Sequence, residues 1–145
     1  MFYGEYTHSL DKKNRIIIPA RFREVITEMC IEKFYITRGL DECLFMFPES
    51  EWKAQESKFK AMPFTKTEAR KFNRLFFAGA VEVAPDKQWR ILVPDYLKDY
   101  AKLSKNIMII GVSSRIEIWS KDKWADFYKS TQQNYEEIAE RLMDI

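Results

Sequence analysis

A nine-residue segment occurs twice in this chain, 75 positions apart, and this repetition constrains the fold more than any other feature of the sequence. Residues 11–19 read Asp-Lys-Lys-Asn-Arg-Ile-Ile-Ile-Pro, and residues 86–94 read Asp-Lys-Gln-Trp-Arg-Ile-Leu-Val-Pro. Each copy predicts a charged turn, a short apolar strand and a proline that opens a helix. The fold must therefore accommodate the same turn and strand at two places.

The similarity between the two halves extends beyond these segments. Before the short helix the offset is 75, and Gly4 matches Gly79. After it the offset is 72, where Gly39 matches Gly111 and Trp52 matches Trp124. Both halves share the order strand, turn, strand, short helix, hairpin, helix. We therefore expect a duplication, with a pseudo-two-fold arrangement in which each half completes the sheet of the other.

The expected fold class is α+β, mainly β with helices. We expect a first repeat at 5–47, a helical connection at 48–75, a second repeat at 76–119 and a C-terminal helix at 120–145. Thr65 and Glu68 match a capping box and predict a helix start, and Gly79 predicts that helix's end. The last helix carries a heptad-like seam, which packs either on its own domain or between protomers. The seam residues are Trp124, Tyr128, Thr131, Tyr135, Ile138 and Leu142.

The composition is that of a globular protein, with 46% hydrophobic and 32% charged residues. The net charge of +2 neither demands nor excludes a nucleic-acid partner, because a nearly neutral total can conceal a basic face. We expect no signal peptide, no membrane span and reduced cysteines, which indicates a cytoplasmic protein. His8 is the single histidine, and Cys30 and Cys43 lack metal-ligand spacing. We therefore predict no enzyme, no catalytic residue, no metal and no cofactor.

The repeated turns suggest another chemistry. In each copy the aspartate, Asp11 or Asp86, can brace the turn by accepting backbone N–H bonds or by holding the arginine four residues later. The side chains that would project outward are Lys12, Lys13 and Arg15 in the first copy and Lys87, Gln88 and Arg90 in the second. Arginine suits guanine and lysine suits phosphate, whereas exposed basic turns are more often plain solvated surface. The recurrence of Asp, Lys and Arg at matching places favours DNA contact.

Several motifs together resemble the bacterial MraZ family over nearly the whole chain. They are residues 4–6, 11–19, 37–41, 69–70, 76–80, 86–90 and 111–119, which include the two Asp-x-x-x-Arg segments. The resemblance implies a swapped-hairpin β-barrel of the AbrB-like group, built from two tandem repeats. It also implies a nucleoid-associated transcriptional regulator that binds double-stranded DNA at direct repeats upstream of the division and cell-wall gene cluster, including its own gene. Relatives form homo-oligomeric rings, octameric or larger, and place the paired Asp-x-x-x-Arg segments on the DNA-facing surface.

The chain departs from the family pattern at the residue before each arginine, which is usually glycine and here is Asn14 or Trp89. If that position requires a positive φ, asparagine tolerates it and tryptophan is strained. We therefore expect the second turn to differ in shape, and we favour Arg15 over Arg90 as a DNA contact. The alternative is a protein-interaction module like the swapped-hairpin antitoxins, although their extended tail is unlike the helical segment expected here.

Overall fold

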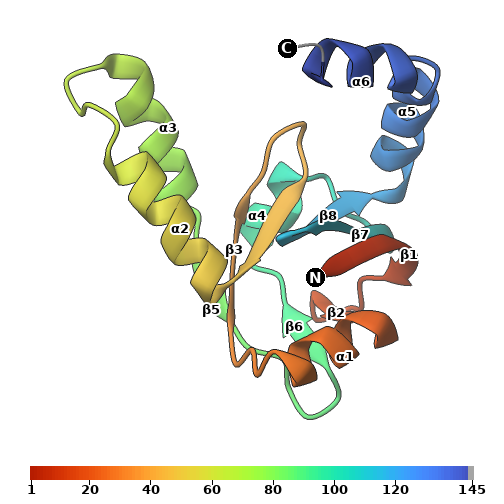
Figure 1. The fold of residues 1–145 in the computed structure, drawn as a ribbon. Helices are drawn as coiled ribbons and strands as arrows, with labels where there is room; N and C mark the ends of the chain where they lie inside the picture. The colour runs from red at the N-terminus through yellow and green to blue at the C-terminus, as the bar shows by residue number, and fades with distance from the viewer. Residues whose placement is uncertain (144–145) are drawn as a thin grey trace.

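The computed structural model describes residues 1–143, which form a six-stranded sheet, a two-stranded ribbon and six helices (Figure 1). In chain order the elements are β1 (Phe2–Ser9), β2 (Arg15–Ile17), α1 (Ala20–Glu28), β3 (Phe34–Arg38), β4 (Leu44–Pro48), α2 (Glu49–Lys60), α3 (Thr67–Ala78), β5 (Val81–Val83), β6 (Arg90–Leu92), α4 (Asp95–Tyr100), β7 (Asn106–Ser113), β8 (Arg115–Ser120), α5 (Lys121–Gln132) and α6 (Tyr135–Met143). The predicted α+β class is confirmed.

The strands of the two halves interleave in the sheet. The sheet has the order β1-β7-β8-β4-β3-β5, and the ribbon pairs β2 with β6. The first strand of each half therefore lies beside the third strand of the other half, with all pairings antiparallel. Exchanging the two halves reproduces the same sheet order in reverse. The prediction that each half completes the other's sheet is confirmed.

The strand register locates the pseudo-two-fold axis. In the ribbon Ile16 lies directly opposite Ile91, and these two residues are each other's equivalents in the repeat. In the sheet the equivalent residues Phe45 and Glu117 lie opposite each other between β4 and β8. The axis therefore passes through these two pairs, from the ribbon to the middle of the sheet.

The register also corrects one sequence match. Phe34 pairs with Pro48 in the first hairpin, and Ile107 pairs with Ser120 in the second. Pro48 and Ser120 are 72 positions apart, whereas Phe34 and Ile107 are 73 apart, because the chain between these paired positions is one residue shorter in the second hairpin. Consequently the predicted equivalence of the glycines at positions 39 and 111 is wrong: Gly111 occupies the place that Arg38 has in the first half.

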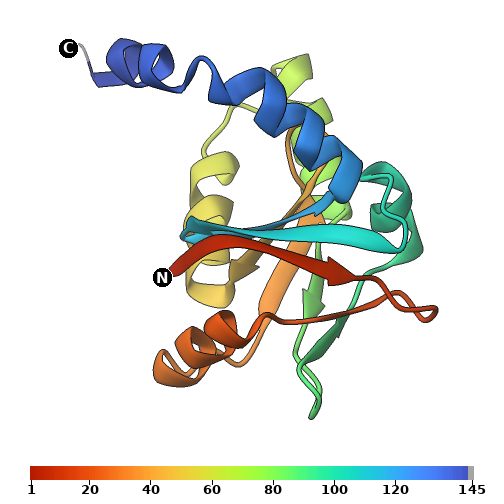
Figure 2. The ribbon, with the colours of Figure 1, turned by 90° about the vertical axis from the view of Figure 1, so that its right-hand side faces the viewer.

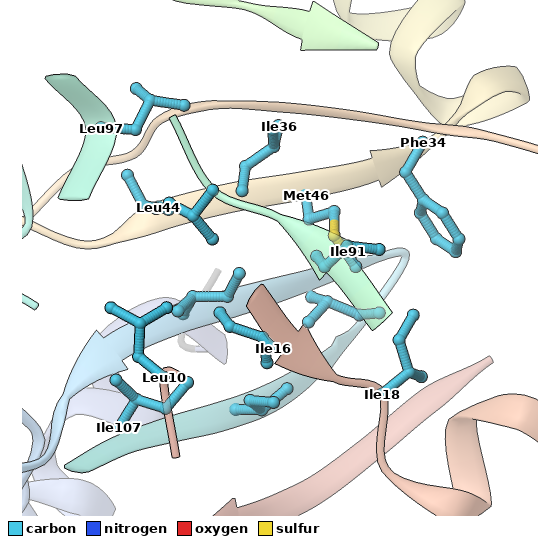
Figure 3. Close-up of a cluster of buried hydrophobic side chains, with 14 of the residues drawn as sticks. Leu10, Ile16, Ile18, Phe34, Ile36, Leu44, Met46, Ile91, Leu97 and Ile107 are labelled. Atoms are coloured by element: carbon cyan, nitrogen blue, oxygen red, sulfur yellow. The ribbon is translucent and has the colours of Figure 1, made fainter. Parts of the chain in front are cut away.

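The main core fills the space between the ribbon and the sheet (Figure 3). Ile16 and Ile91 point from the ribbon toward Met46 and other apolar side chains of the sheet, and all three are almost completely buried. The outer strand positions alternate with these inner ones, as strand geometry requires. Burying side chains of this size stabilises the fold by about 1.5–3 kcal/mol each, so the ribbon is held against the sheet by its central pair.

A second, aromatic cluster fixes the connection between the repeats. Trp52 of α2 stacks on Tyr35 of β3 and on Phe76 of α3, with ring centroids 5.2 and 5.5 Å apart. Phe59 and Phe72 extend this packing along the helices at a centroid distance of 4.8 Å. The helices α2 and α3 therefore form a hairpin on the face of the sheet away from the ribbon. Helix α5 packs on the same face through Trp124 and Trp119, and the two helical arms project from different ends of the sheet (Figure 1).

Two helix boundaries differ from the sequence prediction. The capping box is not formed: α3 begins at Thr67 after Lys66, and no side chain caps its N-terminus. Lys66 N–H instead donates to the carbonyl of Pro63, so Thr65 lies inside a turn. Gly79 ends α3 as predicted, but with φ −80° rather than a left-handed conformation. A Cβ there would lie 2.8 Å from the backbone carbonyl oxygen of Leu75, so close approach of the helix backbone explains this glycine.

The single C-terminal helix that the sequence predicts is two helices. Ser120 caps α5 as predicted, since its hydroxyl accepts from Lys123 N–H at 3.1 Å. The helix ends at Gln132, and the carbonyl of Asn134 accepts the first bond of α6 from Ile138. Asparagine is a favoured residue at this cap position, which explains the break. Within residues 1–143, no helix has both the length and the apolarity that a membrane crossing requires.

A substitution at Gly111 tests the close approach of the β1 backbone to β7. Gly111 faces Gly4, and a Cβ at Gly111 would lie 2.5 Å from both the carbonyl carbon of Phe2 and the nitrogen of Tyr3. Gly111→Ala should lower the free energy of unfolding by about 1–3 kcal/mol in urea denaturation, because backbone must move. The control Val112→Ala, at an exposed neighbour, should cost less than about 1 kcal/mol. Equal stability of the two variants would contradict the close approach.

Candidate nucleic-acid interface

The first turn is held together by one carboxylate. Oδ1 of Asp11 accepts the backbone N–H groups of Lys13 at 2.9 Å and Arg15 at 2.8 Å, and Oδ2 accepts Nε–H of Arg15 at 2.8 Å. The backbone adds bonds from Asn14 N–H to the Asp11 carbonyl and from Asp11 N–H to the Arg15 carbonyl, both 3.0 Å. Four residues are thereby closed into a rigid loop before β2.

The second turn repeats this network. Oδ1 of Asp86 accepts the N–H groups of Gln88 at 2.8 Å and Arg90 at 2.9 Å, and Oδ2 accepts Nε–H of Arg90 at 2.9 Å. The backbone bonds from Trp89 to Asp86 and from Asp86 to Arg90 also recur, at 3.0 and 2.9 Å. The two loops therefore have the same hydrogen-bond pattern.

The expectation that Trp89 gives the second turn a different shape is wrong. Trp89 and Asn14 both have φ of 61°, the left-handed conformation in which the chain can reverse. For a bulky residue this conformation costs roughly 1–3 kcal/mol. The Asp86 network fixes the loop, and the half-buried indole packs against the main core, so both interactions offset the strain. The indole is consequently not free to extend into solvent.

The ribbon places the two turns at its opposite ends. Because β2 and β6 are antiparallel, Arg15 lies opposite Leu92 and Arg90 lies opposite Ile17. Each turn also abuts the other repeat, since Ile18 N–H donates to the carbonyl of Trp89 at 2.8 Å. The reciprocal bond runs from Val93 to Asn14, also at 2.8 Å. Figure 2 shows both loops projecting from the ribbon on the side of the molecule away from α6.

The side chains that the sequence singles out lie on this surface. Lys12, Lys13, Lys87 and Gln88 are exposed, while Arg15 and Arg90 are half-buried. Each aspartate holds its arginine by Nε, and no hydrogen bond to the terminal nitrogens of either guanidinium occurs within residues 1–143. The edge of each guanidinium that suits bidentate contact with guanine or phosphate therefore remains available.

The same bonds shift the acidity of both aspartates. The backbone N–H of Arg15, assisted by its side chain and by the N–H of Lys13, lowers the pKa of Asp11 below its ordinary value. The corresponding donors of Arg90 and Gln88 lower the pKa of Asp86. Both carboxylates are therefore ionised throughout the physiological pH range, and their turns stay braced.

One contact to the first turn has no sequence signal. Nδ2 of Asn14 donates to Oδ1 of Asp95, the first residue of α4, at 2.6 Å. The equivalent of Asp95 in the first repeat is Ala20, so the second turn lacks this tie. The first turn is thus anchored by a polar side chain and the second by the packing of Trp89.

Other chemistry is not indicated in the described part of the chain. No group of three or more His, Cys, Asp or Glu side chains there is placed to hold a metal ion. His8 is half-buried, and burial and the nearby Arg23 lower its pKa. Cys30 and Cys43 are free thiols, and burial raises the pKa of Cys43.

Comparison with known proteins supports one family. Residues 1–75 and 76–145 each match the family described as "MraZ protein, putative antitoxin-like". The chain is similar to proteins named transcriptional regulator MraZ from Carboxydothermus hydrogenoformans and Pelotomaculum thermopropionicum. The first is 54% identical over 99% of this chain and 98% of its own length, and the second 52% identical over 100% and 97%.

The two braces predict a specific response to pH. A carboxyl titration by NMR should give pKa values for Asp11 and Asp86 below the ordinary value of about 3.9. Because these pKa values are depressed in the folded protein, the stabilisation is complete above the unfolded pKa and is lost as pH falls through the folded pKa. Arg15→Ala should raise the pKa of Asp11 toward its ordinary value and leave Asp86 unchanged. An unshifted Asp11 in the parent protein would contradict the brace.

Proposed function

Because this chain belongs to the MraZ family, we propose that it is a transcriptional regulator that binds double-stranded DNA at specific sequences. The proposed sites are direct repeats upstream of the division and cell-wall gene cluster, including its own gene, and would place the protein on the nucleoid. The observation that carries the proposal is the pair of identically braced basic turns at the ends of the ribbon. The expected division into segments 5–47, 48–75, 76–119 and 120–145 remains a prediction.

The braced turns supply the chemistry of DNA recognition. Lys12, Lys13 and Lys87 are point charges suited to phosphate, and Arg15 and Arg90 present fixed guanidinium forks suited to guanine. Immobilising the arginines before binding lowers the entropy lost on contact. Three lysines neutralising three phosphates would give a log–log salt dependence with a slope of about −3, so one protomer binds weakly. Repeated sites bound by repeated protomers would raise the affinity by on the order of 10²–10⁴-fold per linked contact.

The proposed homo-oligomer uses the two helical arms. Between α5, α6 and β1 lies a groove of about 790 Å³ whose lining includes Trp124, Phe127 and Tyr135. Tyr135 is 72% exposed, and Phe64, at the tip of the α2–α3 hairpin, is 79% exposed. The segment 53–77 has a net charge of +5 and the segment 121–145 of −2, so the arms of neighbouring copies attract. Two different complementary surfaces on one protomer join copies head to tail and close into a ring, which we expect to be octameric or larger.

The alternative is a protein-interaction module of the antitoxin type, a likeness that the family description itself states. Antitoxins built on swapped hairpins hold a toxin through an extended tail. Here the chain from Lys121 to Met143 is helical almost throughout, which counts against that mode of binding. Stoichiometric co-purification of a protein of different sequence would favour the alternative, provided that added DNA does not displace that protein.

Removing one arginine tests the recognition surface. Arg15→Ala should abolish specific binding in fluorescence anisotropy on DNA upstream of the protein's own gene, since each bidentate contact is worth about 1–3 kcal/mol and recurs in every protomer. Size-exclusion chromatography should show unchanged assembly, because Arg15 lies on the ribbon, on the side of the molecule away from α6 (Figure 2). The control Lys102→Gln, at an exposed cation outside both helical arms, should bind as the parent does. Undiminished affinity of Arg15→Ala would remove Arg15 from the interface.

The basic face of α3, formed by Arg70 and Arg74, provides a test of the proposed assembly. Arg70 donates to the carbonyl of Phe64 at 3.0 Å, and within residues 1–143 neither Arg70 nor Arg74 has a carboxylate partner. We expect this face to meet acidic side chains, and since none contacts it within the described residues, we propose that a neighbouring copy supplies them. Reversing both charges to glutamate should weaken self-association at least about tenfold in light scattering, and adding Glu136→Lys with Glu140→Lys should restore it. Intact assembly with lost DNA binding would instead place this face on DNA.

A further inference from the structure

The outward face of the β2–β6 ribbon carries two aliphatic side chains between the two arginines. On each strand the middle residue is buried and its neighbours face outward, so Arg15 and Ile17 share the outer face of β2, and Arg90 and Leu92 that of β6. Ile17 is 45% exposed and Leu92 is 56% exposed. They extend the recognition surface beyond the turns.

The two aliphatic residues are equivalents in the repeat. They lie 75 positions apart, and each lies directly opposite the arginine of the other half, Ile17 opposite Arg90 and Leu92 opposite Arg15. One exposed aliphatic residue needs no explanation on a protein surface. Two at symmetry-related positions, each beside a braced guanidinium, form a four-residue array in which cationic and apolar side chains alternate.

The charges around this array select its occupant. Lys12, Lys13 and Lys87 extend from the turns at the two ends of the ribbon, and the acids of the turns, Asp11 and Asp86, already hold their own arginines. A surface of this kind attracts a polyanion. The major groove of DNA is about 12 Å wide and admits a two-stranded β-ribbon. There the base edges carry one kind of apolar group, the C5-methyl of thymine.

We propose that Ile17 and Leu92 are specificity-determining residues that pack against thymine C5-methyl groups next to the bases contacted by Arg15 and Arg90. The proposal rests on the DNA-binding function proposed above. Directly opposed residues have Cβ atoms about 4.5–5.5 Å apart, and alternate residues of one strand are about 6.6–6.8 Å apart. With a rise of about 3.4 Å per base, each thymine lies within about two base steps of an arginine contact.

Exchanging thymine for uracil tests the contact, because it removes the methyl group alone. In fluorescence anisotropy, the parent protein should bind DNA from upstream of its own gene about fourfold more weakly for each contacted thymine replaced, the value of one buried methyl-sized group. Ile17→Ala should no longer respond to uracil at the thymines that Ile17 contacts, and Leu92→Ala should no longer respond to uracil at those that Leu92 contacts. Met29→Ala, an exposed apolar residue at the end of α1, should keep the full pattern.

The outcomes separate this inference from the function on which it rests. Variants that lose the uracil effect but keep the salt slope and the oligomer size support it. It is overturned if no uracil substitution weakens the parent, or if both variants keep the parent's pattern. A change of oligomer size with an unchanged uracil pattern would overturn it by placing the array between copies. If the parent protein shows no preference for this DNA, or Arg15→Ala binds as tightly as the parent, the proposed function itself fails.

Discussion

The pairing of β2 with β6 is the interaction on which the rest of the structure depends. Three residues of each half meet across the pseudo-two-fold axis, with Ile16 and Ile91 facing each other and pointing into the core. This one ribbon covers the open face of the sheet, joins the two repeats and separates the two turns by the length of a strand. The proposed recognition surface is thus the outer side of an element whose inner side is part of the core. A change in the packing of the central pair would move both arginines.

The two turns reach the same shape with different residues. A small set of donors converging on one carboxylate defines each loop, and those donors are mostly backbone N–H groups, which any residue supplies. The side chain before the arginine therefore has only to accept a positive φ. Asn14 does so readily and is tied to Asp95, whereas Trp89 is held there by its packing on the core. The two turns are alike in backbone geometry but differ in the side-chain contacts that hold the residue before the arginine, so the proposed recognition surface is not fully symmetric.

The order of the elements up to β8 and their interleaving could be predicted from the sequence, because each repeated segment encodes the same turn, strand and proline-initiated helix. Strand register was not predictable at the second hairpin, where one residue is lost in a connection and the glycines align in sequence but not in space. Local signals failed where a competing bond was available: Thr65 lies in a turn closed by Pro63 and Lys66, and Asn134 breaks the last helix. Trp89 was misjudged because propensity describes an isolated residue, and here the surrounding hydrogen bonds decide.

The interleaved sheet order also determines when this protein can fold. Strand β1 pairs with β7, and Thr7 and Met108, which meet across that pair, are 101 positions apart. On the ribosome the first half therefore emerges with its edge strand unpaired and its core open, and it cannot complete its sheet until the second half has been synthesised. Contacts so distant along the chain slow folding and leave strand edges exposed in the meantime. Because both repeats lie in one chain, each half finds its partner within the same molecule, but only after the second repeat has been synthesised.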